Sequence, residues 1–240
     1  MRKLFHLEHG VIPACDVYTL KMLREIIAAT CDIKGIVGYK IGAVLGLTYG
    51  LSQIVNVVHE YTDLPVIYDH QKAGTDIPQM GEKFATICAE AGIKGVIIFP
   101  HAGPETEAVF IDSLAAKNLV PIVGGEMTHP KYLAKEGGFI RDSAPVEMYT
   151  IAARKGVDHF VVPGNKPEMI KHYHTLLSQL VREPKYCMPG IGKQGGNIKS
   201  AFEPLEDASA YAIIGAGIYE HRDIAAAAQR FCDEVLTWKK

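Results

Sequence analysis

The charged residues Asp69, Lys72 and Asp76 offer the clearest chemistry in this 240-residue sequence. They follow the apolar run Val66–Tyr68, which predicts a strand that ends in charge. A carboxylate at ~4 Å stabilises an ammonium by roughly 4 kcal/mol at an effective dielectric constant of about 20, so we expect Lys72 to stay protonated. Such a lysine can protonate a developing carbanion, and the carboxylates can repel a substrate carboxylate. The alternative is a strand end whose charges are simply solvated.

Eight short apolar runs, separated by stretches with helical spacing, must position these residues. The runs are Val11–Cys15, Ile36–Ile41, Pro65–Tyr68, Gly95–Phe99, Leu119–Val123, His159–Val162, Lys185–Met188 and Tyr211–Ile214. Strands that are apolar on both faces and alternate with helices predict a parallel sheet, and eight such units predict one (β/α)8 TIM barrel domain over residues 1–240. A doubly wound open sheet is the alternative, but the first run is followed by Asp16 and not by a GxGxxG loop.

Polar residues at the other strand ends are expected to join the same site, because TIM barrels place their chemistry at the carboxyl ends of the strands. Lys40 lies among apolar neighbours, where an unpaired lysine would be costly, so we expect Asp69 to be its partner. Asp16 is expected to contact a ligand, although it could instead cap a helix beginning near Val17. Thr128, after the fifth run, is a candidate hydrogen-bonding group for a bound ligand.

Glycine-rich loops follow the seventh and eighth runs. In a barrel these loops commonly bind phosphate, because glycines let backbone N–H groups approach the oxygens and a helix N-terminus adds partial positive charge. The candidate phosphate-binding residues are Lys193, Gln194, Gly195, Gly196, Gly215, Ala216 and Gly217.

Taken in order, these motifs resemble the orotidine 5'-phosphate decarboxylase family. The matching segments are Asp16, Lys40, the Asp-Lys-Asp array followed by Ile77-Pro78, Glu126–Pro130, Val161–Pro163, Pro189–Ile191 and Gln194–Gly196. The resemblance implies decarboxylation of orotidine 5'-monophosphate to uridine 5'-monophosphate in pyrimidine biosynthesis, without a metal ion or organic cofactor. It implies catalytic roles for Lys72, Asp69, Asp76 and Lys40, ribose contact by Asp16 and pyrimidine contact by Thr128. It also implies a homodimer in which Asp76 reaches the neighbouring subunit's site.

Two departures from the family pattern concern the site itself. The family's array is DxKxxD, whereas Asp69, Lys72 and Asp76 are spaced DxxKxxxD, so a bulge would be needed for their side chains to converge. Ala216 stands where the family has an arginine that binds the substrate phosphate. We expect Lys193 to compensate, with Arg222 or the glycine amides as alternatives.

Two other functions remain open at this stage. One is a magnesium-dependent decarboxylase of the same superfamily that acts on a β-keto sugar acid phosphate, against which the Glu126–Pro130 turn counts. The other is a barrel that binds a phosphate ligand without turnover, suggested by Ala216 and the altered spacing.

Composition narrows the classes of partner. A formal net charge of −2 without a basic stripe argues against nucleic-acid binding. No apolar run approaches the ~18 residues of a membrane helix, and no signal peptide is evident, so we expect a cytoplasmic protein. The five cysteines are odd in number and widely spaced, which predicts reduced thiols.

Overall fold

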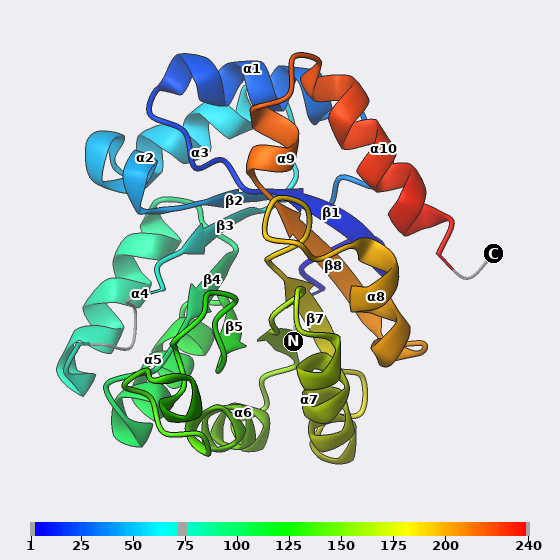
Figure 1. Cartoon of the computed structure of the whole chain (residues 1–240). Helices are drawn as coiled ribbons and strands as arrows, with labels where there is room; N and C mark the ends of the chain where they lie inside the picture. The colour runs from blue at the N-terminus through cyan, green and yellow to red at the C-terminus, as the bar shows by residue number, and fades with distance from the viewer. Residues whose placement is uncertain (1–2, 72–75, 239–240) are drawn as a thin grey trace.

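The computed structural model describes residues 3–71 and 76–238 and shows eight parallel strands surrounded by helices (Figure 1). The strands are β1 (His9–Pro13), β2 (Tyr39–Ile41), β3 (Val66–Asp69), β4 (Gly95–Ile98), β5 (Val120–Gly124), β6 (His159–Val161), β7 (Lys185–Met188) and β8 (Ser209–Ile214). From β2 to β8 each strand pairs with the next one along the chain, and β8 pairs with β1. The predicted (β/α)8 barrel is confirmed.

The barrel closes between β1 and β2 through a short seam. Val11 bridges Ile36, Ala14 bridges Lys40, and the Cys15 amide donates to the Lys40 carbonyl at 2.8 Å. The strand predicted over residues 36–41 is therefore interrupted, and only its last three residues form the regular ladder with β3. This seam places Lys40 directly beside the end of β1.

The helices form a ring around the strands (Figure 1). They are α1 (Leu20–Thr30), α2 (Ala43–Tyr49), α3 (Leu51–His59), α4 (Gly81–Glu90), α5 (Pro104–Ala116), α6 (Ala144–Arg154), α7 (Pro167–Leu180), α8 (Ile198–Phe202), α9 (Ala216–Tyr219) and α10 (Ile224–Leu236), with 3₁₀ turns η1 (Pro78–Met80), η2 (Ala134–Glu136) and η3 (Glu203–Leu205). Each longer helix buries an apolar stripe against the sheet. In α1 this stripe includes Leu23, Ile26 and Ile27, and burial of each such side chain contributes about 1.5–3 kcal/mol.

A second apolar cluster fills the inside of the barrel. Leu4 and Phe5 pack with the inward-facing side chains near the amino ends of the strands. Ile97, Val161 and Ile213 belong to the same cluster and also line the cavity at the opposite end. The barrel is therefore a packed core with its open end at the carboxyl ends of the strands, where the polar residues gather.

All five cysteines are free thiols, and Cys15, Cys88, Cys187 and Cys232 are buried. Burial raises the pKa of the Cys88 and Cys232 thiols to about 12, so these groups stay protonated at neutral pH. Within residues 3–71 and 76–238, no helix has the length and apolar character needed to cross a membrane.

Candidate active site

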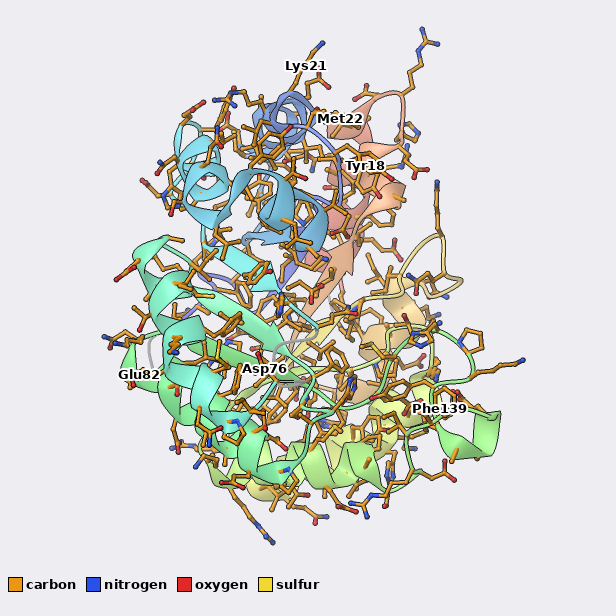
Figure 2. The ribbon with its side chains drawn as sticks, turned by 90° about the vertical axis from the view of Figure 1, so that its left-hand side faces the viewer. Tyr18, Lys21, Met22, Asp76, Glu82 and Phe139 are labelled. Carbon is orange, nitrogen blue, oxygen red and sulfur yellow. The ribbon has the colours of Figure 1, made fainter. Side chains whose placement is uncertain are left out.

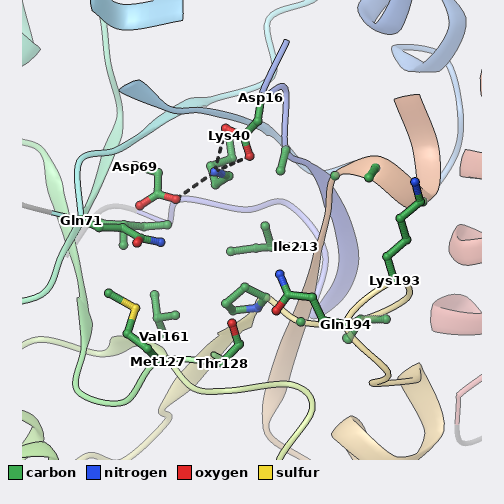
Figure 3. A pocket seen from close by; sticks show the side chains of 18 of the residues that line it. Asp16, Lys40, Asp69, Gln71, Met127, Thr128, Val161, Lys193, Gln194 and Ile213 are labelled. Carbon is green, nitrogen blue, oxygen red and sulfur yellow. Dashed lines mark hydrogen bonds and ion pairs between the residues drawn. The ribbon is translucent and has the colours of Figure 1, made fainter. Parts of the chain in front are cut away.

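A cavity of about 270 Å³ opens at the carboxyl ends of the strands (Figure 3). Most of the predicted site residues line it together: Asp16, Lys40, Asp69, Thr128, Lys193, Gln194, Gly215, Ala216 and Gly217. They come from β2, β3, the segments after β1, β5 and β7, and the start of α9 with the residue before it. The barrel thus brings together residues that are up to about two hundred positions apart in the sequence.

Lys40 is the centre of the charged side of this cavity (Figure 3). Its Nζ lies 2.8 Å from Oδ2 of Asp69 and 3.2 Å from Oδ2 of Asp16. Burial alone would lower the pKa of Lys40, but the two carboxylates outweigh burial and the net shift is upward. The predicted contact between Lys40 and Asp69 is therefore present, and the lysine stays an ammonium.

Asp69 presents a second oxygen that the ammonium does not use. Its Oδ1 is buried and has no hydrogen-bond partner among the described residues, while Oδ2 accepts from Lys40. A buried carboxylate oxygen without a donor is costly. The arrangement therefore holds negative charge at the wall of the cavity, where it can repel a ligand carboxylate or accept a hydrogen bond.

Asp16 is half-exposed at the rim, with 41% of its side-chain surface accessible. The alternative reading of Asp16 as a helix cap is wrong, because α1 begins only at Leu20 and the Thr19 hydroxyl accepts the capping hydrogen bond from the Met22 amide at 3.2 Å. Gly42 leaves room for the carboxylate, since a Cβ there would lie 2.5 Å from Oδ1 of Asp16. Asp16 is thereby free to contact both Lys40 and a ligand.

The segment after β5 is anchored by a buried acid that sequence reasoning left without a role. Glu126, only 2% exposed, accepts a hydrogen bond from Lys166 Nζ at 2.7 Å and another from the Tyr173 hydroxyl. Asn165 adds a hydrogen bond to the Thr128 carbonyl at 3.1 Å. These contacts fix the backbone that presents Thr128 to the cavity. The signals in the sequence were a charged residue shortly after an apolar strand and the match of the Glu126–Pro130 turn to the family pattern.

The loop after β7 is folded on itself in a way that corrects one expectation. The Gly195 amide donates to the Gly192 carbonyl at 2.9 Å, and the Gly196 amide donates to the Gly190 carbonyl at 3.1 Å. Neither glycine lines the cavity in the described structure. Their amides, expected to contact phosphate, instead hold the turn that presents Gln194.

Lys193 lies at the opposite edge of the cavity from Asp69 (Figure 3). Its Nζ forms an ion pair with Glu220, at the end of α9, and both side chains are more than half exposed. Arg222, the alternative phosphate-binding residue, precedes the last helix, because α10 begins at Ile224 with Asp223 as its cap. Arg222 is exposed and does not line the described cavity.

Asp76 (Figure 2) does not line the described cavity of its own chain. Its Oδ1 accepts from the Ile77 amide at 2.7 Å, and its carbonyl accepts from the Thr106 hydroxyl at 3.1 Å. The carboxylate is exposed. Lys72, the predicted proton donor, lies outside the described residues.

Comparison with known proteins identifies the family to which the chain belongs. Residues 10–231 match the model of the "Orotidine 5'-phosphate decarboxylase / HUMPS family". A protein of Methanococcus maripaludis named orotidine 5'-phosphate decarboxylase is 31% identical over 80% of this chain and 82% of its own, and one of that name from Pyrococcus abyssi is 30% identical over 94% and 98%. A crystal structure of orotidine 5'-monophosphate decarboxylase from Methanocaldococcus jannaschii, complexed with the inhibitor BMP, superposes with a TM-score of 0.82 at 25% identity, covering 95% of this chain and 98% of that one.

Proposed function

Because this chain belongs to the orotidine 5'-phosphate decarboxylase / HUMPS family, we propose that it converts orotidine 5'-monophosphate to uridine 5'-monophosphate and carbon dioxide, in pyrimidine nucleotide biosynthesis. The observation that carries the proposal is the Asp16–Lys40–Asp69 group, with Lys40 and Asp69 buried, in a cavity that Thr128 and Gln194 also line. The reaction proposed here uses no metal ion and no organic cofactor.

The mechanism depends on opposite charges at the reacting carbon. Binding of the ribose and phosphate would hold the substrate carboxylate against Asp69, whose Oδ1 has no partner among the described residues. When the bond to the carboxylate breaks, its electron pair stays on the pyrimidine carbon and carbon dioxide leaves. The Lys72 ammonium then stabilises the carbanion and gives it a proton.

The other residues are proposed to bind the parts of the nucleotide that do not react. Asp16, at the accessible rim, would accept hydrogen bonds from the ribose hydroxyls, and Thr128 would contact the pyrimidine ring. Gln194 would contact the ring or the phosphate. The phosphate itself would lie against Gly215–Gly217, where the first amides of α9 lack acceptors within the helix.

The direct test is the fall in absorbance of orotidine 5'-monophosphate with the purified protein, in buffer with and without EDTA. We expect turnover that EDTA leaves unchanged. Activity that EDTA abolishes and magnesium restores would support the β-keto sugar acid phosphate reaction. Tight binding of uridine 5'-monophosphate without carbon dioxide release would support a non-catalytic barrel.

The donor set also favours the metal-free reaction over the magnesium-dependent one. Hard divalent cations need several oxygen ligands, whereas the Asp16 and Asp69 carboxylates are both engaged by Lys40. The described part of the chain contains no group of three or more His, Cys, Asp or Glu side chains that could hold a metal ion.

Lys193 is proposed to supply the cation that Ala216 cannot. Replacing it with alanine should raise the KM for orotidine 5'-monophosphate roughly tenfold or more, because a charge-assisted contact contributes about 1.5–3 kcal/mol. Steady-state kinetics with the nucleotide and with orotidine, which lacks the phosphate, measures the effect. Only the nucleotide should respond.

Two variants serve as controls for the Lys193 prediction. Glu220→Gln releases Lys193 from its ion pair and should leave KM unchanged or lower it. Arg222→Ala removes an exposed charge outside the cavity and should have no effect. If Arg222→Ala raises KM and Lys193→Ala does not, the phosphate is bound from the β8 side.

We further propose a homodimer in which Asp76 completes the partner's site. Asp76 is exposed and lies outside the cavity of its own chain. The adjacent Ile77 is also exposed, with 59% of its surface accessible, so this segment can contact another subunit. A two-fold axis would place each Asp76 at the other subunit's site.

Subunit mixing tests this composite site. Asp76→Asn and Lys72→Ala proteins should each be nearly inactive. In an equal mixture about half of the dimers are heterodimers, and each heterodimer has one intact site and one site with both substitutions. The mixture should therefore recover roughly a quarter of the wild-type activity per site. Activity is measured after subunit exchange has been verified with differently tagged chains. A verified exchange without recovery would assign Asp76 to its own chain's site.

A further inference from the structure

A second cavity of about 350 Å³ lies between α5 and α6 and shares no lining residue with the candidate active site. Its walls are mainly apolar and include Pro104, Phe139, Ile140, Met148 and Ile151. Phe139 projects fully into solvent beside it (Figure 2). The volume is within the range of small-molecule sites, about 300–1,000 Å³.

Glu107 is the unusual polar group of this cavity. The residue is 1% exposed, and its Oε1 has no hydrogen-bond partner among the described residues. Burial raises the pKa of this carboxyl to about 8, so it is largely protonated at neutral pH. An unpaired buried carboxyl is unfavourable, and a ligand that supplies a donor would relieve that cost.

The neighbouring polar groups are already engaged. The His101 ring Nε2 lies 2.7 Å from the Tyr132 hydroxyl. Arg141 at the rim forms an ion pair with Glu147. Among the described residues that line this cavity, Glu107 is the buried polar group with an oxygen that has no partner.

We propose that this cavity binds a small organic ammonium ion with an apolar body. The ammonium would lie against Glu107, and the apolar part would contact Met148, Ile151 and Ile140. A metal ion fits less well, because it needs several ligands and the described residues offer no cluster of three. An anion also fits less well, because the buried group it would contact is the acid Glu107, and the nearby Arg141 is already paired with Glu147. On binding near pH 7, Glu107 gives its proton to the solvent and its carboxylate pairs with the ammonium.

Calorimetry with 2-phenylethylammonium and the full-length protein at pH 7 tests the proposal. We expect it to bind roughly tenfold or more tightly than 2-phenylethanol or 3-phenylpropionate, which have similar size but lack the cation. Glu107→Gln should weaken the ammonium at least about tenfold. Glu105→Gln, which removes an exposed acid from the same helix turn, is the matched control and should bind as the wild type does.

A second measurement needs no variant. Titrations in two buffers of different ionisation enthalpy should reveal proton release on binding to the wild-type protein, and none with Glu107→Gln. Equal affinity for the alcohol, absence of proton release, or no detectable ammonium binding would each overturn the proposal. These readouts do not depend on the decarboxylase activity.

Discussion

Replacing Lys72 with alanine should reduce kcat for orotidine 5'-monophosphate by about 10⁴-fold or more, while the Kd for uridine 5'-monophosphate stays within about tenfold. The large effect is expected because the ammonium both stabilises the carbanion and protonates it, and general acid and electrostatic contributions of this kind multiply. The product carries no carboxylate and no developing charge, so its binding relies on other groups. Absorbance kinetics and calorimetry measure the two quantities.

Lys83→Ala is the matched control, because Lys83 is an exposed lysine on the following helix. It should change neither quantity. Near-normal turnover by Lys72→Ala would refute the proposed mechanism. A parallel loss of product binding would instead indicate that the lysine mainly organises the nucleotide site.

Replacing Lys40 with methionine should be nearly as damaging, with kcat/KM reduced by about 10³-fold and stability by about 3–5 kcal/mol. The side chain is buried between Asp69 and Asp16, and its removal leaves a buried carboxylate without its cation. Urea unfolding measures the stability, and steady-state kinetics measures the activity.

A double variant separates these two effects. Lys40→Met combined with Asp69→Asn removes the buried carboxylate that would otherwise lack its cation. Asp16 can remain solvated because it is half-exposed. We expect most of the lost stability to return, while turnover stays low. Return of turnover together with stability would contradict the catalytic roles of both Lys40 and Asp69, and stability that does not return would contradict the buried-charge explanation.

The part of the site that could be predicted from sequence is the part set by neighbouring strands. Lys40 and Asp69 lie at or next to the carboxyl ends of consecutive strands, and such strands of a barrel are adjacent, so their contact could be expected from strand order. The strand predicted over residues 36–41 was too long, because Gly38 packs so closely that a Cβ would lie 2.9 Å from the Pro65 carbonyl oxygen. Such close approach is not visible in an apolar pattern.

The rest depended on contacts between distant loops. Glu126 contacts Lys166 and Tyr173, which lie 40 and 47 residues further along the chain. These contacts depend on where the segment after β6 runs, which the local sequence does not indicate. The pairing of Lys193 with Glu220 likewise depends on how two loops approach each other. Asp16 was a plausible helix cap in the sequence, but Thr19 caps α1 and Asp16 contacts Lys40 instead.

The seam between β1 and β2 has a consequence for local unfolding. β1 forms a continuous five-residue ladder with β8, but it meets β2 through two isolated bridges and a few backbone hydrogen bonds, including Val37 amide to Val11 carbonyl at 3.1 Å. Segments with fewer cooperative hydrogen bonds open more often, so the amides of Val37 and Cys15 should exchange with deuterium faster than those within β8.

The same seam carries Asp16 on one side and Lys40 on the other. A nucleotide that contacts both sides would bind only the closed seam and so stabilise it. At a ligand concentration of about 100 Kd, this should slow amide exchange at the seam roughly a hundredfold. Mass spectrometry of deuterium uptake with uridine 5'-monophosphate measures this protection. Nucleotide binding and closing of the seam between β1 and β2 would then be coupled, so a change that weakens one would also weaken the other.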